Sequence, residues 1–165
     1  MRTGSAPTAR TPGEPGGRVV VIGVGNEFRR DDGAGPAVIR RLLLRAPHDV
    51  ELMTCDGEPT RLIETWAGAP LAIVVDAVRA EPPHPGSLHR LVLVRPLGGT
   101  QAASSHGLGL DDAVALALAL DRMPGRLIVH AVEAGNLAQG TGLTPAVAAA
   151  VDALAEAVMR DIQNA

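Results

Sequence analysis

Two stretches of apolar, mostly β-branched residues constrain the fold of this chain more than any other feature. Val19–Ile22 and Leu71–Val75 are apolar at every position instead of every second one. This pattern is typical of strands that are covered on both faces, as in a parallel sheet. Further strands are expected at Val50–Cys55, Ser87–Val94 and Arg126–Val132. His89 and Arg90 interrupt the second of these, which favours a place at a sheet edge.

Segments with helical character alternate with these strands. They are Ala37–Arg45, Arg61–Trp66, the nearly all-apolar and therefore buried Leu108–Leu120, and a final helix capped by Thr144 and begun by Pro145. Alternating strands and helices predict an α/β domain with helices on both faces of a largely parallel sheet. In such sheets ligands bind beyond the carboxyl ends of the strands.

Length and composition bound the organisation of the chain. Its 165 residues, 46% hydrophobic and 20% charged, are enough for one globular domain, which we place at 18–165. The segment 1–17 is rich in Pro, Gly and Arg, lacks the apolar region of a secretion signal, and is expected to be a disordered tail. A cytoplasmic domain is the resulting expectation, and a monomer is expected because one sandwich accounts for the apolar faces of the predicted elements.

Charge and residue usage exclude several classes of partner. The net charge is −3, with one Trp, one Phe and no Tyr, so neither a basic face nor a stacking surface for nucleic acid is expected. The longest apolar run, Ala113–Leu120, is far shorter than the roughly 20 residues that cross a bilayer, so no membrane partner is expected. Cys55 is the single cysteine, which excludes an internal disulfide or a metal cluster built from cysteines.

The loop after the first strand carries the first candidate chemistry. Gly23 and Gly25 suggest a dinucleotide-binding turn, but Phe28 stands where that fingerprint requires a third glycine. Asp31 and Asp32 would also repel a pyrophosphate. The sequence contains no P-loop, no nucleophile-elbow motif and no HExxH motif.

Two carboxylates and one imidazole form the candidate site. Asp32 lies in this first loop with Asn26 and Asp31, Asp76 closes the third strand, and His106 ends the long connection after the fourth strand. Taken singly, such residues are usually caps, turn residues or exposed side chains. Together, with one coordination position open, they would suit a borderline divalent ion.

A set of collinear motifs gives a more specific signal. It comprises Val20-Val21-Ile22-Gly23-Val24-Gly25-Asn26, Asp31-Asp32-Gly33-x-Gly35, Val75-Asp76-Ala77, Ser105-His106-x-Leu108-Gly109-Leu110 and Gly142-Leu143-Thr144-Pro145-x-Val147. In order and spacing this set resembles the hydrogenase maturation endopeptidases. The resemblance covers nearly everything from Arg18 onward.

The resemblance implies a fold and an activity. The fold is a three-layer α/β/α sandwich of the phosphorylase/hydrolase-like kind, with a mixed five-stranded sheet of order 2-1-3-5-4 and strand 4 antiparallel. The activity is removal of the C-terminal extension from the large-subunit precursor of nickel–iron hydrogenase after nickel insertion. Asp32, Asp76 and His106 take the positions of the metal-contacting and catalytic residues, with nickel supplied by the substrate; the isolated protein could hold another divalent metal.

Several residues keep two interpretations. Asn26, Asp31 and Glu133 are candidates for supporting the metal ligands or for contacting substrate. Glu27–Arg30 departs from the apolar residues usual in the family, either as a solvated loop lip or as an altered docking surface for the precursor. His130 is expected to be a packed strand histidine, with a minor role at the site left open. A non-catalytic metal-binding escort in hydrogenase assembly is the alternative function, and a nucleotide-dependent oxidoreductase is a weaker third.

Overall fold

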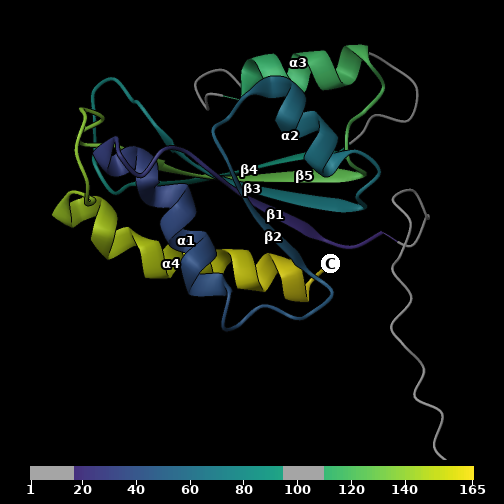
Figure 1. Ribbon diagram of the computed structural model, residues 1–165, viewed down its shortest axis with the longest axis horizontal. Coiled ribbons are helices and arrows are strands. Elements are labelled where there is room, and N and C mark those ends of the chain that lie inside the picture. Colours follow the sequence, from purple (N-terminus) through teal and green to yellow (C-terminus); the bar gives the residue numbers. More distant parts are fainter. Residues whose placement is uncertain (1–16, 95–109) are drawn as a thin grey trace, which may run out of the picture.

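A five-stranded sheet forms the middle layer of the protein (Figure 1). The computed structural model describes residues 17–94 and 110–165, so most of the expected tail at 1–17 lies outside them. The strand order is β2-β1-β3-β5-β4, which confirms the predicted order. The strands are β1 (Val20–Val24), β2 (Glu51–Cys55), β3 (Leu71–Val78), β4 (Leu88–Val94) and β5 (Arg126–Glu133).

Four strands run parallel, and β4 is antiparallel to β5. The apolar positions explain this arrangement, because β1 and most of β3 are buried along their whole length whereas β4 is largely exposed. The carboxyl ends of β1, β2, β3 and β5 therefore lie along one edge of the sheet. This is the edge at which the sequence predicts the site.

Helices cover both faces of the sheet (Figure 1). α1 (Ala34–Leu42) and α4 (Pro145–Gln163) lie on one face, and α2 (Pro59–Trp66) and α3 (Asp111–Ala119) lie on the other. Each face has its own apolar core: Ile73 and Leu154 belong to the first, and Val74 and Trp66 to the second. The three-layer α/β/α sandwich is therefore confirmed. Within the described ranges, no helix combines the length and the hydropathy that a membrane span needs.

Some predicted boundaries are wrong, and the reasons are physical. α1 begins at Ala34, directly after the short 3-10 helix η1 (Arg30–Gly33), so Pro36 sits inside its first turn. β3 does not end at Asp76, because its pairing with β5 continues to Val78. α3 is only partly buried: its Leu118 and the following Leu120 are exposed, since an Ala- and Leu-rich helix has no polar side to mark the solvent face.

A partly buried ion pair fixes the end of α4 to the sheet. The carboxylate of Asp161 accepts two hydrogen bonds from the guanidinium of Arg90 in β4, at 3.1 and 2.6 Å, and lies 2.7 Å from Nε2 of His130 in β5. Burial lowers the pKa of His130 although Asp161 raises it, so the ring is neutral at pH 7 and its Nε2–H donates to the carboxylate. His130 is thus a packed strand histidine, as predicted, held on the α4 face of the sheet.

Replacing Asp161 by Asn is expected to destabilise the protein by about 2–3 kcal/mol, because it removes the charge that both partners contact. Urea unfolding followed by circular dichroism measures the effect. Asp152→Asn, at an exposed position earlier in α4, is the matched control and should change stability by less than about 0.5 kcal/mol. Equal midpoints for the two variants would contradict a stabilising role for the Asp161 cluster.

Candidate functional site

The turn after β1 brings the first acidic residue to the carboxyl edge of the sheet. Gly25 has a φ of +136°, and a Cβ atom there would lie 1.8 Å from the main-chain oxygen of Asp32. Only glycine permits this crossing of the chain. The glycine therefore allows η1 to fold back over the end of β1, with Asp32 against the turn.

Asp32 is held by the backbone of the same loop. Its Oδ2 accepts a hydrogen bond of 2.9 Å from the main-chain N–H of Asn26 and lies 3.7 Å from a guanidinium nitrogen of Arg29. The side chain of Asn26 has a different partner, since its Oδ1 accepts from the N–H of Phe28 at 2.9 Å. Asn26 therefore shapes the loop with its side chain and orients Asp32 with its main chain.

Asp76 is a buried carboxyl group near the end of β3. It is 6% exposed and is paired in register with Ala131 of β5. Burial raises its pKa to about 7; the N–H of Ala77 opposes this rise, and the negative charge of Asp32 adds to it. The two predicted carboxylates are therefore close enough to repel one another. Such a pair favours a bound proton or a cation between them.

His106, the third predicted residue, lies outside the described residues, so its place at the site stays a prediction. In the two described ranges, no group of three His, Cys, Asp or Glu side chains is arranged to hold a metal ion. The structure thus supplies two carboxylates, Asp32 and Asp76, from η1 and β3. Their oxygens fit a divalent cation that takes oxygen and imidazole ligands.

Asp31 is adjacent to Asp32 but has a different role. It is fully buried, and its carboxylate accepts hydrogen bonds from the N–H groups of Gly135, Asn136 and Thr144 at 2.7–2.9 Å and from the Thr144 hydroxyl at 2.9 Å. Burial raises its pKa, but these four donors together lower it. Asp31 therefore ties η1 to the loop before α4. Thr144 precedes α4 as predicted, but its hydroxyl donates a hydrogen bond to Asp31 and does not cap the helix.

Glu133 lies at the same end of the sheet and is also engaged. Its carboxylate accepts a hydrogen bond from the main-chain N–H of His84 and contacts Nε2 of His89, both at 2.7 Å. The contact with His89 and then the N–H of His84 lower its pKa. Glu133 holds the loop between β3 and β4 against β5, so the contacts that the structure describes are those of a supporting residue.

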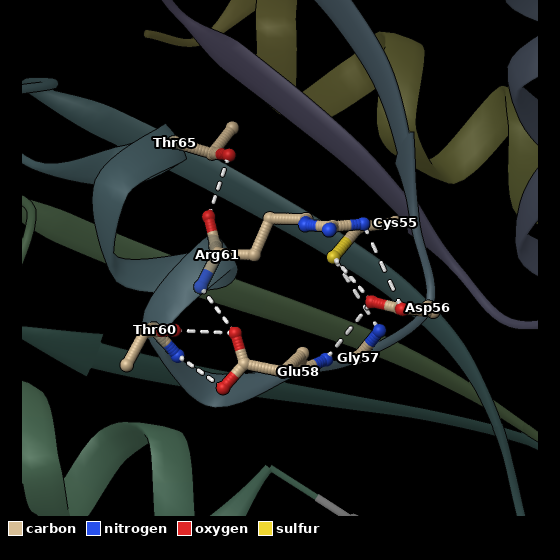
Figure 2. A network of polar contacts seen from close by, with 7 residues as sticks. All are labelled: Cys55, Asp56, Gly57, Glu58, Thr60, Arg61 and Thr65. Atoms are coloured by element: carbon tan, nitrogen blue, oxygen red, sulfur yellow. Dashed lines mark hydrogen bonds and ion pairs between the residues drawn. The ribbon is translucent and has the colours of Figure 1, made fainter.

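The end of β2 completes the edge and offers no nucleophile. Cys55 is buried, its main-chain oxygen accepts from the N–H of Gly25, and its thiol sulfur accepts from the N–H of Gly57 (Figure 2). Burial raises the pKa of the thiol, which keeps it protonated and unreactive near pH 7. Glu58 then caps α2 by accepting from the N–H groups of Thr60 and Arg61.

Sequence reasoning missed the parts of this site that come from distant loops. The partners of Asp31 lie more than 100 residues along the chain, and no local pattern marks them. Arg30 has a left-handed backbone with a φ of +47°, which is also invisible in the sequence. The one sequence feature that points to this region is the segment Glu27–Arg30, which departs from the apolar residues usual in the family.

Comparison with known proteins places this arrangement in a family. The hydrogenase maturation protease family (HycI) matches residues 38–161, a range that includes Asp76 and begins after Asp32. The chain is 27% identical to the hydrogenase 2 maturation protease of Escherichia coli K12 over an aligned length of 153 residues, and the match covers 89% of this chain and 92% of that protein.

Solved structures give the same picture. The fold matches the solution structure of an endopeptidase from Escherichia coli with a TM-score of 0.74 and 26% identity, covering 89% of this chain and 93% of that one. It also matches the [NiFe] hydrogenase maturation protease HybD from Thermococcus kodakarensis, with a TM-score of 0.67, 22% identity and coverages of 87% and 97%. The chain therefore belongs to the hydrogenase maturation protease family and is a hydrolase of the endopeptidase class.

Proposed function

We propose that this endopeptidase removes the C-terminal extension of a nickel–iron hydrogenase large-subunit precursor after nickel has been inserted. The observation that carries the proposal is the buried Asp76 carboxyl beside Asp32 at the carboxyl edge of the sheet. This pair supports assigning the family's activity to the carboxyl edge of the sheet. The relatives are named for hydrogenase maturation, and the site offers the oxygen ligands that a substrate-borne cation would meet.

Three residues have roles in this proposal. Asp32, Asp76 and His106 would contact the nickel that the precursor carries, and the precursor would supply the remaining ligands. A divalent cation at such a site polarises the scissile carbonyl or lowers the pKa of a water. The raised pKa of Asp76 means that this carboxyl is about half protonated near pH 7. It could therefore hold a proton in the free enzyme and release it when a cation replaces that proton.

The supporting residues keep the two carboxylates in place. Asn26 orients Asp32 through its main-chain N–H. Asp31 holds the same loop in place by accepting hydrogen bonds from the N–H groups of Gly135 and Thr144. Asp76 needs no such loop, because it is part of a central strand. We propose that the rigid loop and strand present the two oxygens at a fixed separation, so that an unloaded precursor lacks the contact that positions its scissile bond.

The proposed reaction is tested by a processing assay. The purified protein is mixed with the large-subunit precursor from the same organism, either nickel-loaded or nickel-free, and mass spectrometry reads the C-terminus. We expect loss of a C-terminal peptide from the loaded precursor only. Cleavage of both forms would support the protease activity and would show that nickel is not the element that the enzyme recognises. Binding of the loaded form without cleavage would favour a non-catalytic escort.

We further propose that the protein works in the cytoplasm as a monomer and without nucleic acid. Among the described residues, the protein's own helices cover both faces of the central strands β1 and β3, which supports a monomer. Light scattering of the purified protein tests the monomer directly, and a mass of two chains would overturn it.

A further inference from the structure

A hollow of about 170 Å³ opens beside the loop that carries Asp32. Phe28 and Leu143 contribute apolar surface to it, and Glu27, Arg30, Arg40 and Thr141 contribute polar groups. Phe28 is the only phenylalanine of the chain and is 68% exposed. Its exposed ring is therefore free to contact an apolar group of a ligand in the hollow.

Main-chain hydrogen bonds hold one wall of the hollow in place. The N–H of Arg30 donates to the oxygen of Gly140 at 2.9 Å, and the N–H of Gly140 donates to the oxygen of Phe28 at 2.8 Å. Arg30 has a φ of +47°, a conformation that costs energy for a residue with a side chain. The pairing with Gly140 holds it there. The exposure of Phe28 is therefore not the result of a loose loop.

The charges of the hollow are unevenly compensated. Arg40 forms an ion pair of 2.7 Å with Glu27. Within the described part of the chain, the guanidinium of Arg30 makes one long hydrogen bond, 3.4 Å to the main-chain oxygen of Thr141. Among the residues that the structure describes, no carboxylate lies in ion-pair range of Arg30. Its guanidinium can therefore still donate most of its hydrogen bonds to a ligand.

We propose that this hollow binds an acidic side chain of the precursor, with an adjacent apolar residue of the precursor against Phe28. This inference rests on the proposed function and names part of its substrate. Guanidinium and carboxylate form a strong, often bidentate pair, which matches the uncompensated Arg30. The protein as a whole carries a net charge of −3, so an acidic segment gains little from its overall charge and depends on a local cation. A local cation therefore both attracts and orients such a segment.

The position of the hollow limits which part of the precursor reaches it. Arg30 and Asp32 belong to the same four-residue 3-10 helix, so the hollow adjoins the catalytic edge. An extended peptide advances about 3.3 Å per residue. The acidic residue should therefore lie within a few positions of the scissile bond, not at the far end of a long extension.

Replacing Arg30 by Gln tests the charge without a change of backbone preference, since both residues bear the same strain at a φ of +47°. With the nickel-loaded precursor as the probe, R30Q should raise KM about tenfold and lower kcat/KM by a similar factor. R41Q is the matched control, because Arg41 pairs with Asp152 on the surface and does not line the hollow. It should process the precursor at the wild-type KM.

A charge exchange identifies the source of the carboxylate. Each Asp or Glu near the scissile bond of the precursor is changed in turn to Arg and tested with R30E. Restored processing by one such pair supports the proposal. A KM that depends on the α-carboxylate of the precursor, tested by amidating the C-terminus, would overturn it in favour of a terminal-carboxylate site. An unchanged KM for R30Q would overturn it altogether.

The apolar contact has its own pair of variants. F28A should raise KM several-fold, whereas L44A removes an even more exposed apolar side chain outside the hollow and should leave KM unchanged. The processing assay on the wild-type protein distinguishes failure of the proposed function from failure of the proposed role of the hollow. If the wild-type protein cuts no precursor, the proposed function fails. If it cuts normally and both R30Q and F28A match it, only the hollow loses its role.

Discussion

Asparagine in place of Asp76 is expected to abolish processing and, at the same time, to stabilise the metal-free protein at pH 8. The two effects have one cause. At this pH the wild-type carboxyl is ionised although it is buried and faces Asp32. The amide keeps the shape and removes the charge, so the folding penalty disappears together with the anionic carboxylate that the cation would contact.

The sign and size of the stability gain follow from the raised pKa. A folded pKa of about 7, against an ordinary value of 3.8, means that the penalty is fully present above pH 7 and fades as the pH falls toward 4. This difference sets an upper limit of about 4 kcal/mol. Because the amide must also stay buried, we expect D76N to gain about 1–3 kcal/mol at pH 8.

Urea unfolding in the presence of a chelator measures the gain. D76N should exceed the wild type at pH 8, and the difference should shrink steadily on the way to about pH 4.5, near the ordinary carboxyl pKa. D49N is the matched control, because Asp49 is an exposed turn residue before β2, at the opposite edge of the sheet. It should alter neither stability nor processing. A D76N variant that still processed the loaded precursor would remove Asp76 from the reaction.

The strands show which parts of the fold could be predicted from the sequence alone. β1 and β3 are buried on both faces, so their continuous apolar runs identified them and their central places. The polar residues His89 and Arg90 marked β4 as an edge strand, and the pairing confirms it. Their specific partners, Glu133 and Asp161, are 44 and 71 residues away in sequence. Such contacts depend on the packing of whole elements, which a local pattern does not contain.

The two neighbouring acidic residues of η1 show more clearly what could not be predicted from the sequence. Asp31 and Asp32 are chemically identical in sequence, and both follow the same glycine turn. The family resemblance selected Asp32 as the metal-contacting residue, but no feature of the sequence shows what Asp31 does. Its function depends on three N–H groups of loops that only the folded chain brings near. The short helix η1 buries Asp31 and leaves Asp32 at the carboxyl edge of the sheet.

Substitution of Asp31 by Ala is accordingly expected to destabilise the protein by about 2–4 kcal/mol, because it removes the buried carboxylate that accepts from three loop N–H groups and from the Thr144 hydroxyl. The loss should be largest at pH 7. Asp31 has a lowered pKa in the folded protein, so its contribution is present above the unfolded pKa near 3.8 and is lost as the pH falls through the folded value. The difference between wild type and D31A in urea unfolding should therefore narrow in acid.

The D31N variant separates charge from shape at the same position. Its amide would present one oxygen and one NH₂ group to the donors that now meet a carboxylate, so D31N should recover only part of the loss in D31A. D112N, at an exposed residue of the first turn of α3, should stay within about 0.5 kcal/mol of wild type. If D31A instead matched the wild type in stability and lost only processing, Asp31 would belong to the reaction itself. Loss of both would show that this buried carboxylate holds the loop on which Asp32 depends.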